Sequence, residues 1–408
     1  MFYPLQGTSQ HYIWGGKSYI PEWLQIQPQH THYAEWWLGA HPSSPSILVF
    51  NGKPIALNQY LETHPTALGD ASVQTFGCEL PYLLKILDVE KPLSIQLHPT
   101  KKQAEIGFAA ENAAGIPLTD PKRTYKDNNH KPEMMIALSD FWLLHGFKTK
   151  AKIQQSLERH ESLKPLAARL QQQDLHCFYA DIMQADQTQL SAWLLPIIEQ
   201  QKAAYQQQQL TLDNPDYWVL YSLESMKISL DKLDPGLLCF YLFNIVHVKQ
   251  GEGIYQDAGI PHAYLRGQNI ELMACSDNVI RGGLTPKHID ITELLKVIDC
   301  TEITPQIIIP APSKLSSYTY PTPAKDFALQ NIRYQAGEKI TETAKSAVIL
   351  LVMQGQLCLR EQCLQKQRLK DGPTALCLKQ GESAFIEVGT HFEISGEQNG
   401  YCILAKLP

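Results

Sequence analysis

A glycine-free stretch, residues 149–232, separates two parts of the chain that are rich in glycine, proline and aromatic residues. Apolar residues recur in this stretch at helical spacing, for example at Leu175, Phe178 and Ile182. Prolines punctuate it, so we expect several separate helices rather than one. The flanking parts contain short apolar runs bounded by turn residues, which is typical of β-strands. The sequence therefore predicts a mainly β protein with a helical insertion.

Four apolar runs outside the helical stretch have the length and composition of strands. They are residues 33–39, 93–98, 134–138 and 237–248. The last run ends at a glycine-rich turn, residues 251–253.

We predict three domains from these changes along the chain. Residues 1–148 together with 233–310 form a metal-binding β domain, and residues 149–232 form the helical insertion. Residues 311–408 form a C-terminal β domain, because their glycine turns are spaced as in a sandwich or barrel.

Composition excludes several classes of protein. No run approaches the roughly 20 apolar residues that cross a membrane. The first residues lack a basic segment followed by an apolar one, so we expect no secretory signal and a cytoplasmic location. The net charge is −6 and no basic block stands out, which disfavours nucleic acid as a partner. The nine cysteines include no Cys-x-x-Cys pair, so we expect reduced, mostly buried thiols and no disulfide framework.

Residues with metal-ligand chemistry occur on both sides of the helical stretch. Gln96 and His98 are two apart in a predicted strand and can reach one point, while Glu133 and His262 would come from other strands. Two imidazoles, a carboxylate and an amide oxygen suit zinc, although manganese, cobalt and iron are harder to exclude. Taken singly, His98 or His262 could be a hydrogen-bonded core histidine.

A second group of polar residues lies between 271 and 287. Arg281 and Lys287 offer fixed cations to an anionic group such as phosphate, and Gly282 and Gly283 allow close backbone approach. The alternative is structural: Arg281 could form an ion pair with Asp277 or Glu271.

These motifs together resemble a known family. Gln96-x-His98-Pro99 and residues 130–133, 259–264 and 276–287 are similar to the motifs of type I mannose-6-phosphate isomerases (phosphomannose isomerases) of the cupin superfamily. The resemblance implies a cupin-type double β-barrel (jelly-roll) with a helical insertion, and a monomer. It also implies interconversion of D-mannose 6-phosphate and D-fructose 6-phosphate, which supplies precursors of GDP-mannose.

The resemblance also implies roles for individual residues. One zinc ion per chain would be bound by Gln96, His98, Glu133 and His262. The catalytic residues would be Arg281, Glu271 and Lys131. The residues that bind the sugar phosphate would be Ser94, Lys85 and Lys287.

The proposed reaction moves a proton between C1 and C2 of the open-chain sugar through a cis-enediol. Glu271 is our first candidate for the base, and zinc-bound hydroxide and Lys131 are alternatives. Two other functions stay open: another cupin metalloenzyme acting on a sugar phosphate or using iron, or a non-catalytic sugar-binding bicupin. Gln96 and the cations at 281 and 287 favour the isomerase over both.

Overall fold

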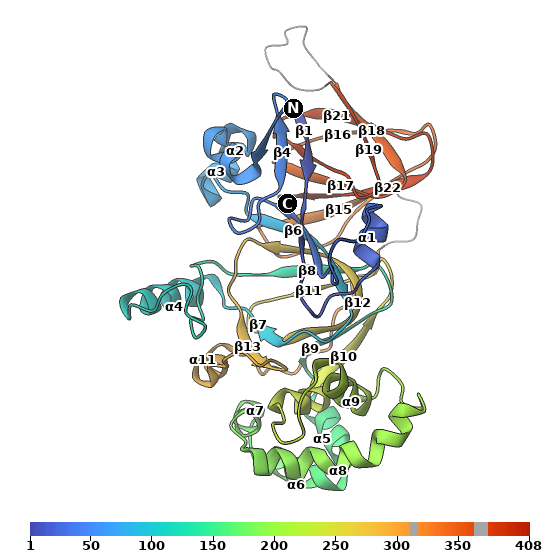
Figure 1. Ribbon diagram of the computed structural model, residues 1–408. Helices are drawn as coiled ribbons and strands as arrows, with labels where there is room; N and C mark the ends of the chain where they lie inside the picture. Colours follow the sequence, from blue (N-terminus) through green and yellow to red (C-terminus); the bar gives the residue numbers. More distant parts are fainter. Residues whose placement is uncertain (311–315, 363–373) are drawn as a thin grey trace.

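The computed structural model describes residues 1–310, 316–362 and 374–408. Its strands form sheets of ten, eight and four strands, so the predicted mainly β character with helices is confirmed (Figure 1). In the view of Figure 1 the helices of the glycine-free stretch lie together at the bottom, the ten-stranded sheet lies in the middle, and the other two sheets lie at the top. In the described ranges, no helix is both long and apolar enough to cross a membrane.

The ten-stranded sheet is organised around its longest strand, β12. Its strands are β2 (Thr8–Gln10), β3 (Glu35–Gly39), β6 (Tyr82–Val89), β7 (Ile95–Leu97), β8 (Glu133–Ala137), β9 (Phe141–Phe147), β10 (Phe243–Val248), β11 (Gly253–Gln256), β12 (His262–Ala274) and β13 (Ile280–Gly283). The first residues of β12 pair with β7 and β9, whereas the residues from Gly267 onward pair with β6, and those from Asn269 also pair with β8. Gly267 has φ +124°, a backbone conformation that favours glycine, and it lies where β12 changes neighbours.

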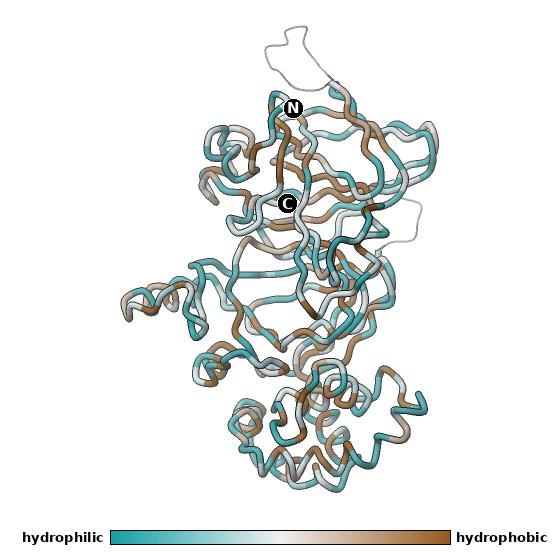
Figure 2. Tube along the Cα trace, in the orientation of Figure 1, coloured by the Kyte–Doolittle hydropathy of each residue, from teal (hydrophilic) through white to brown (hydrophobic). Residues whose placement is uncertain are grey.

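The central strands β17 and β20 of the eight-stranded sheet are buried on both faces. Its strands are β14 (Ser317–Thr319), β15 (Ala328–Tyr334), β22 (Gly400–Lys406), β17 (Val348–Gln354), β20 (Ser383–Ile386), β1 (Phe2–Gln6), β4 (Ile47–Phe50) and β5 (Lys53–Ala56). Val348 and Leu350 pack toward the four-stranded sheet, β16 (Lys339–Thr343), β21 (His391–Ser395), β18 (Gln356–Glu361) and β19 (Ala375–Lys379). Ile349 and Leu351 pack in the same core as residues of the ten-stranded sheet. Both faces being covered explains the continuous apolar sequence of β17, and hydrophobic residues concentrate along these strands in Figure 2.

The sheets also connect distant parts of the sequence. In the N-terminal strand β1, Leu5 lies opposite Ser383 of β20 and opposite Leu48 of β4, so the first strands belong to the same sheet as the last ones. The division into three domains stays a prediction, and its boundary at residue 311 lies outside the described residues.

Helices form in the glycine-free stretch, as the sequence predicts, and also outside it. Those of the glycine-free stretch are α5 (Lys150–Glu158), η2 (Glu161–Leu163), α6 (Lys164–Gln172), α7 (Leu175–Met183), α8 (Gln187–Gln206) and α9 (Pro215–Met226). Four of them begin at a side chain that accepts a backbone N–H, namely at Thr149, Asp174, Asp186 and Asn214. Leu175, Phe178 and Ile182 are buried on one face of α7, as their spacing predicts. The remaining helices are α1 (Tyr19–Leu24), α2 (Leu57–Thr63), η1 (Pro65–Ala67), α3 (Asp70–Phe76), α4 (Lys101–Ala113), η3 (Pro235–Leu238), α10 (Cys239–Leu242) and α11 (Ile291–Val297).

The predicted strand over residues 237–248 is half wrong. Its first part is helical, in η3 and α10, and only Phe243–Val248 forms the strand β10. Pro235 follows Asp234, whose side chain caps the new helix, and this pair starts a helical turn. The following residues are fully buried, and a continuous apolar run does not distinguish a buried helix from a buried strand.

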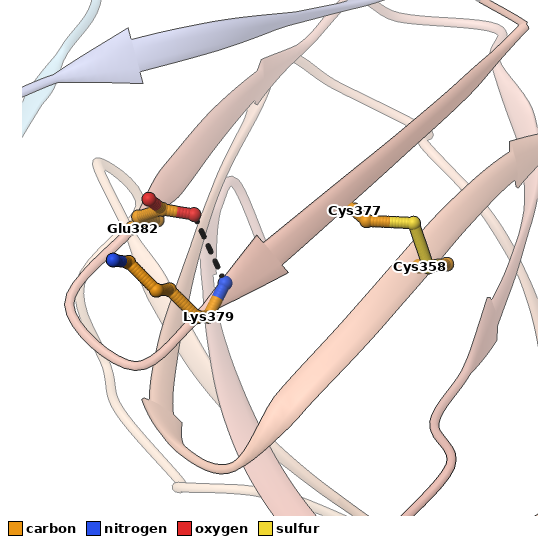
Figure 3. The surroundings of a disulfide bond; sticks show 4 residues. All are labelled: Cys358, Cys377, Lys379 and Glu382. Carbon is orange, nitrogen blue, oxygen red and sulfur yellow. Dashed lines mark hydrogen bonds between the residues drawn. A yellow bond between two sulfur atoms is a disulfide. The ribbon is translucent and has the colours of Figure 1, made fainter.

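The prediction of reduced, mostly buried cysteines is also partly wrong. Cys358 of β18 and Cys377 of β19 lie directly opposite each other and form a disulfide (Figure 3). At the end of β19, the backbone N–H of Lys379 donates a hydrogen bond to the Glu382 carboxylate. Cys78 and Cys177 are exposed thiols, and Cys363 lies outside the described residues. The sequence could not show the disulfide because it depends on the register of a hairpin.

Candidate metal centre and its surroundings

One row of residues crosses four neighbouring strands of the ten-stranded sheet. His262 of β12 lies opposite Gln96 of β7 and opposite His145 of β9, and Gln96 also lies opposite Arg281 of β13. Residues directly opposite each other in antiparallel strands point to the same face. His98 is the next residue after Gln96 that faces this side. The pairing therefore brings Gln96, His98, His262 and Arg281 together, as the sequence predicts for the first three.

Glu133 completes a buried group with the two histidines. It begins β8, and its carboxylate oxygens Oε1 and Oε2 lie 3.2 Å from His98 Nε2 and 3.4 Å from His262 Nε2. All three side chains are fully buried. Their ligand atoms lie within 4.8 Å of one another, as in a site that could hold a metal ion.

The hydrogen bonds of the histidines fix which nitrogen faces Glu133. His98 Nδ1 lies 2.8 Å from the carbonyl oxygen of Asn278, and His262 Nδ1 lies 2.9 Å from that of Ile260. A carbonyl only accepts, so each Nδ1 must donate, and in the neutral tautomer with this N–H the lone pair is on Nε2, which faces the carboxylate. Burial lowers the pKa of His98 to about 4, which keeps that ring neutral.

Three ligand atoms are thus left without a hydrogen bond. His98 Nε2, His262 Nε2 and Glu133 Oε2 are buried and have no hydrogen-bond partner among the described residues. Two lone pairs facing a carboxylate are costly unless a cation lies between them. The donor set fits zinc, and Gln96 lies opposite His262 on the same face of the sheet.

Lys131 lies at the edge of this group. Its Nζ atom is 3.3 Å from Glu133 Oε1, and its side chain is buried. Although burial alone would raise the pKa of Glu133, its surroundings, among them the Lys131 cation, hold this pKa well below its usual range. Glu133 is therefore an anion, as a metal ligand must be.

A second buried cluster surrounds Glu271. Lys85 of β6 lies opposite Glu271 of β12, and its Nζ atom is 3.1 Å from Glu271 Oε2 and 3.7 Å from Glu35 Oε2. The Tyr264 hydroxyl donates to Glu271 Oε1 at 2.8 Å. Burial raises the pKa of Glu271, and the nearby Glu133 adds to that effect while Lys85 opposes it. Burial alone would lower the pKa of Lys85, but Glu35 and Glu271 raise it.

Sequence reasoning gave no role to several of these side chains. Tyr264 is the last residue of the motif 259–264, and a signal for Glu35 is its charge inside the apolar run 33–39. His145 and Gln256 form a buried hydrogen bond of 2.6 Å between His145 Nδ1 and Gln256 Oε1. Gln256 lies opposite Glu133, so this pair flanks the metal centre.

Arg281 and Lys287 are cations without a carboxylate partner among the described residues. Asp277 instead contacts His41, with Asp277 Oδ1 3.3 Å from His41 Nε2, and Glu271 is paired with Lys85. The structural alternative for Arg281 therefore finds no support. Burial lowers the pKa of Arg281, and burial followed by Arg281 itself lowers the pKa of Lys287. Ser94, which precedes β7, is partly buried.

The fold and these contacts define a mainly β protein with a buried metal-binding centre beside a group of cations. Residues 2–150 match the family model described as phosphomannose isomerase type I, catalytic domain. The chain is 37% identical to the mannose-6-phosphate isomerase of Salmonella typhimurium and 36% identical to that of Escherichia coli, and each comparison covers 94% of both chains. The chain belongs to the mannose-6-phosphate isomerase family.

Solved structures of relatives agree with this assignment. A Salmonella typhimurium mannose 6-phosphate isomerase bound to its substrate fructose 6-phosphate and zinc has a TM-score of 0.84 and 34% identity, covering 100% of this chain and 99% of that one. A zinc-bound mannose 6-phosphate isomerase matches with the same scores and coverage.

Proposed function

We propose that the chain is a zinc-dependent isomerase that interconverts D-mannose 6-phosphate and D-fructose 6-phosphate and so supplies precursors of GDP-mannose. The observation that carries this proposal is the buried convergence of His98, Glu133 and His262, whose facing atoms lack hydrogen bonds among the described residues. The names of the relatives and the substrate-bound structure support the same reaction.

Gln96, His98, Glu133 and His262 would hold one zinc ion. When bound, zinc supplies a positive charge beside the sugar oxygens that become negative in the reaction. The protein fixes this set in advance, because the carbonyl groups of Asn278 and Ile260 orient the two imidazoles.

The proton transfer between C1 and C2 needs a group that takes a proton from carbon and returns it to the neighbouring carbon. Glu271 is our first candidate, because its raised pKa makes its carboxylate a better base than an exposed one. Lys85 and Tyr264 hold its two oxygens in place. Lys131 is the competing candidate, and its contact with Glu133 places it next to the metal centre.

The phosphate end of the substrate needs cations that are not already paired. Arg281 and Lys287 meet this requirement in the described part of the chain, and Ser94 would add a hydroxyl donor. Arg281 also shares its row with Gln96, so it can reach both the reacting oxygens and the phosphate side.

We further infer that the strands form two cupin-type β-barrels, with the helical stretch 149–232 inserted into the first. The change of partners of β12 at Gly267 supports a sheet that curls toward closure. A monomer in the cytoplasm that acts on a small sugar phosphate, without nucleic acid or membrane partners, is the state we propose.

A coupled assay that follows fructose 6-phosphate formation from mannose 6-phosphate tests the function. We expect turnover that is lost on chelation and restored by zinc. A protein that keeps its metal but does not turn over this substrate would instead be another cupin metalloenzyme. A protein that binds no metal would be a sugar-binding bicupin.

A further inference from the structure

The loop that follows Arg281 contains two consecutive residues with positive φ angles, an uncommon backbone conformation. Gly283 has φ +130° and Leu284 has φ +51°, and the latter value is uncommon for a residue with a side chain. A Cβ at position 283 would lie 2.6 Å from the Cα of Gly236. This loop leads from Arg281 to Lys287, so its shape decides where these two cations stand relative to each other.

One carboxylate outside the loop holds this shape. Asp234 Oδ1 accepts the backbone N–H groups of Leu284 at 2.9 Å and of Gly236 at 2.7 Å. Asp234 Oδ2 accepts the backbone N–H of Thr285 at 3.0 Å. The same side chain therefore caps η3 and accepts hydrogen bonds from two consecutive residues of the loop.

A second contact comes from the helical part of the chain. The hydroxyl group of Tyr179, on α7, lies 3.1 Å from the place that a Cβ at position 282 would occupy. Gly282 follows Arg281 directly, so α7 packs on the backbone beside the arginine. The loop is thus held both at its start and at its middle by residues that precede β10 in the sequence.

We propose that Asp234 is a positioning residue, which holds the loop between Arg281 and Lys287 so that both cations meet the same phosphate group. This inference rests on the proposed function. Without the carboxylate, the N–H groups of Leu284 and Thr285 lose their acceptor, and the loop can leave its unusual conformation. The two cations then no longer form one preorganised site.

Asp234→Ala tests the inference directly. We expect the KM for mannose 6-phosphate to rise about tenfold or more, with a smaller change in kcat and an unchanged zinc content. Hydrogen exchange of the peptide that contains residues 281–287 should become faster. Asp234→Asn should lie between this variant and the wild type, because the amide keeps one oxygen acceptor but turns an N–H toward a backbone donor.

Glu382→Ala is the matched control. It removes a carboxylate that also accepts a backbone N–H, that of Lys379 at 3.0 Å, in the turn between β19 and β20. Its KM and the exchange of residues 281–287 should equal those of the wild type. A purely structural role of Asp234 would lower the melting temperature without raising KM more than it lowers kcat.

Two results would overturn the inference: a KM of Asp234→Ala within about twofold of the wild-type value, or unchanged exchange of the loop. If Asp234→Ala does not fold, Asp234→Asn carries both measurements. If the wild type does not convert mannose 6-phosphate, the proposed function fails, while the exchange measurement still decides whether Asp234 holds the loop.

Discussion

Lys85 lies directly opposite Glu271 across β6 and β12, and its Nζ atom is 3.1 Å from Glu271 Oε2. The proposed base is therefore one half of a buried ion pair. Burial raises the pKa of Glu271, and the nearby Lys85 cation acts in the opposite direction. The rate of proton transfer by Glu271 should consequently depend on Lys85 as well as on Glu271.

Glu271→Gln should lower kcat about 100-fold or more with zinc still bound, because the amide cannot take the proton. Lys85→Met should cause a comparable loss, since it leaves the Glu271 carboxylate buried without its cation. The double variant should lose less than the product of the two effects. Steady-state kinetics of all four proteins check this, and multiplicative losses would show that the two residues act independently.

His98→Ala should lose bound zinc and activity together, because it removes one of the converging ligand atoms. Arg281→Ala should keep its zinc and lose turnover by about 100-fold or more, as expected for a cation that stabilises developing charge. His247→Ala is the control, since His247 lies on β10 and pairs with Asp140. The zinc content and the kcat of each variant are measured on the same samples. An active, metal-free His98→Ala would refute the zinc site.

Gly283→Ala should strongly destabilise the protein, because its Cβ would lie 2.6 Å from the Cα of Gly236 at φ +130°. Gly337→Ala is the control, with φ +76° and no atom within 4 Å of its Cβ. That change should cost only about 1 kcal/mol of the free energy of unfolding. The melting temperatures of the two variants are compared by thermal unfolding. Equal values would contradict the close packing of the loop after Arg281 on Gly236.

Lys148 should make stability depend on pH above neutrality. Burial, with Arg159 and Lys152 adding to it, lowers the pKa of Lys148 to about 7 from an ordinary value of 10.5. Between these values the unfolded chain binds more protons at this site than the folded protein, so the contribution of Lys148 becomes more favourable as pH rises. The free energy of unfolding of the wild type minus that of Lys148→Met should increase by up to about 1 kcal/mol per pH unit from pH 7 to 9. A difference that does not change with pH would contradict the lowered pKa of Lys148.

The convergence of His98, Glu133 and His262 agrees with the sequence analysis, because the chemistry of the metal centre lies in the residue types themselves. Gln96 lies opposite His262 in the register of β7 with β12, and its role as a ligand stays a prediction. The helices of the glycine-free stretch were equally predictable from their periodicity and caps.

The features that the sequence does not predict depend mostly on contacts between residues far apart in the sequence. The pairing of Lys85 with Glu271 requires the register of β6 with β12, and the disulfide requires that of β18 with β19. The helical turn at 239–242 is hidden because every residue in it is apolar and buried. The hydrogen bond from the backbone N–H of Leu284 to the Asp234 carboxylate joins two loops that no local sequence pattern connects.

A zinc titration of the chelated protein tests the central claim most directly, with zinc per chain and mannose 6-phosphate turnover measured at every step. We predict that activity returns in proportion to bound zinc and levels off at one ion per chain. Full activity in the chelated protein, or a protein that fills with zinc and stays inactive, would contradict the account.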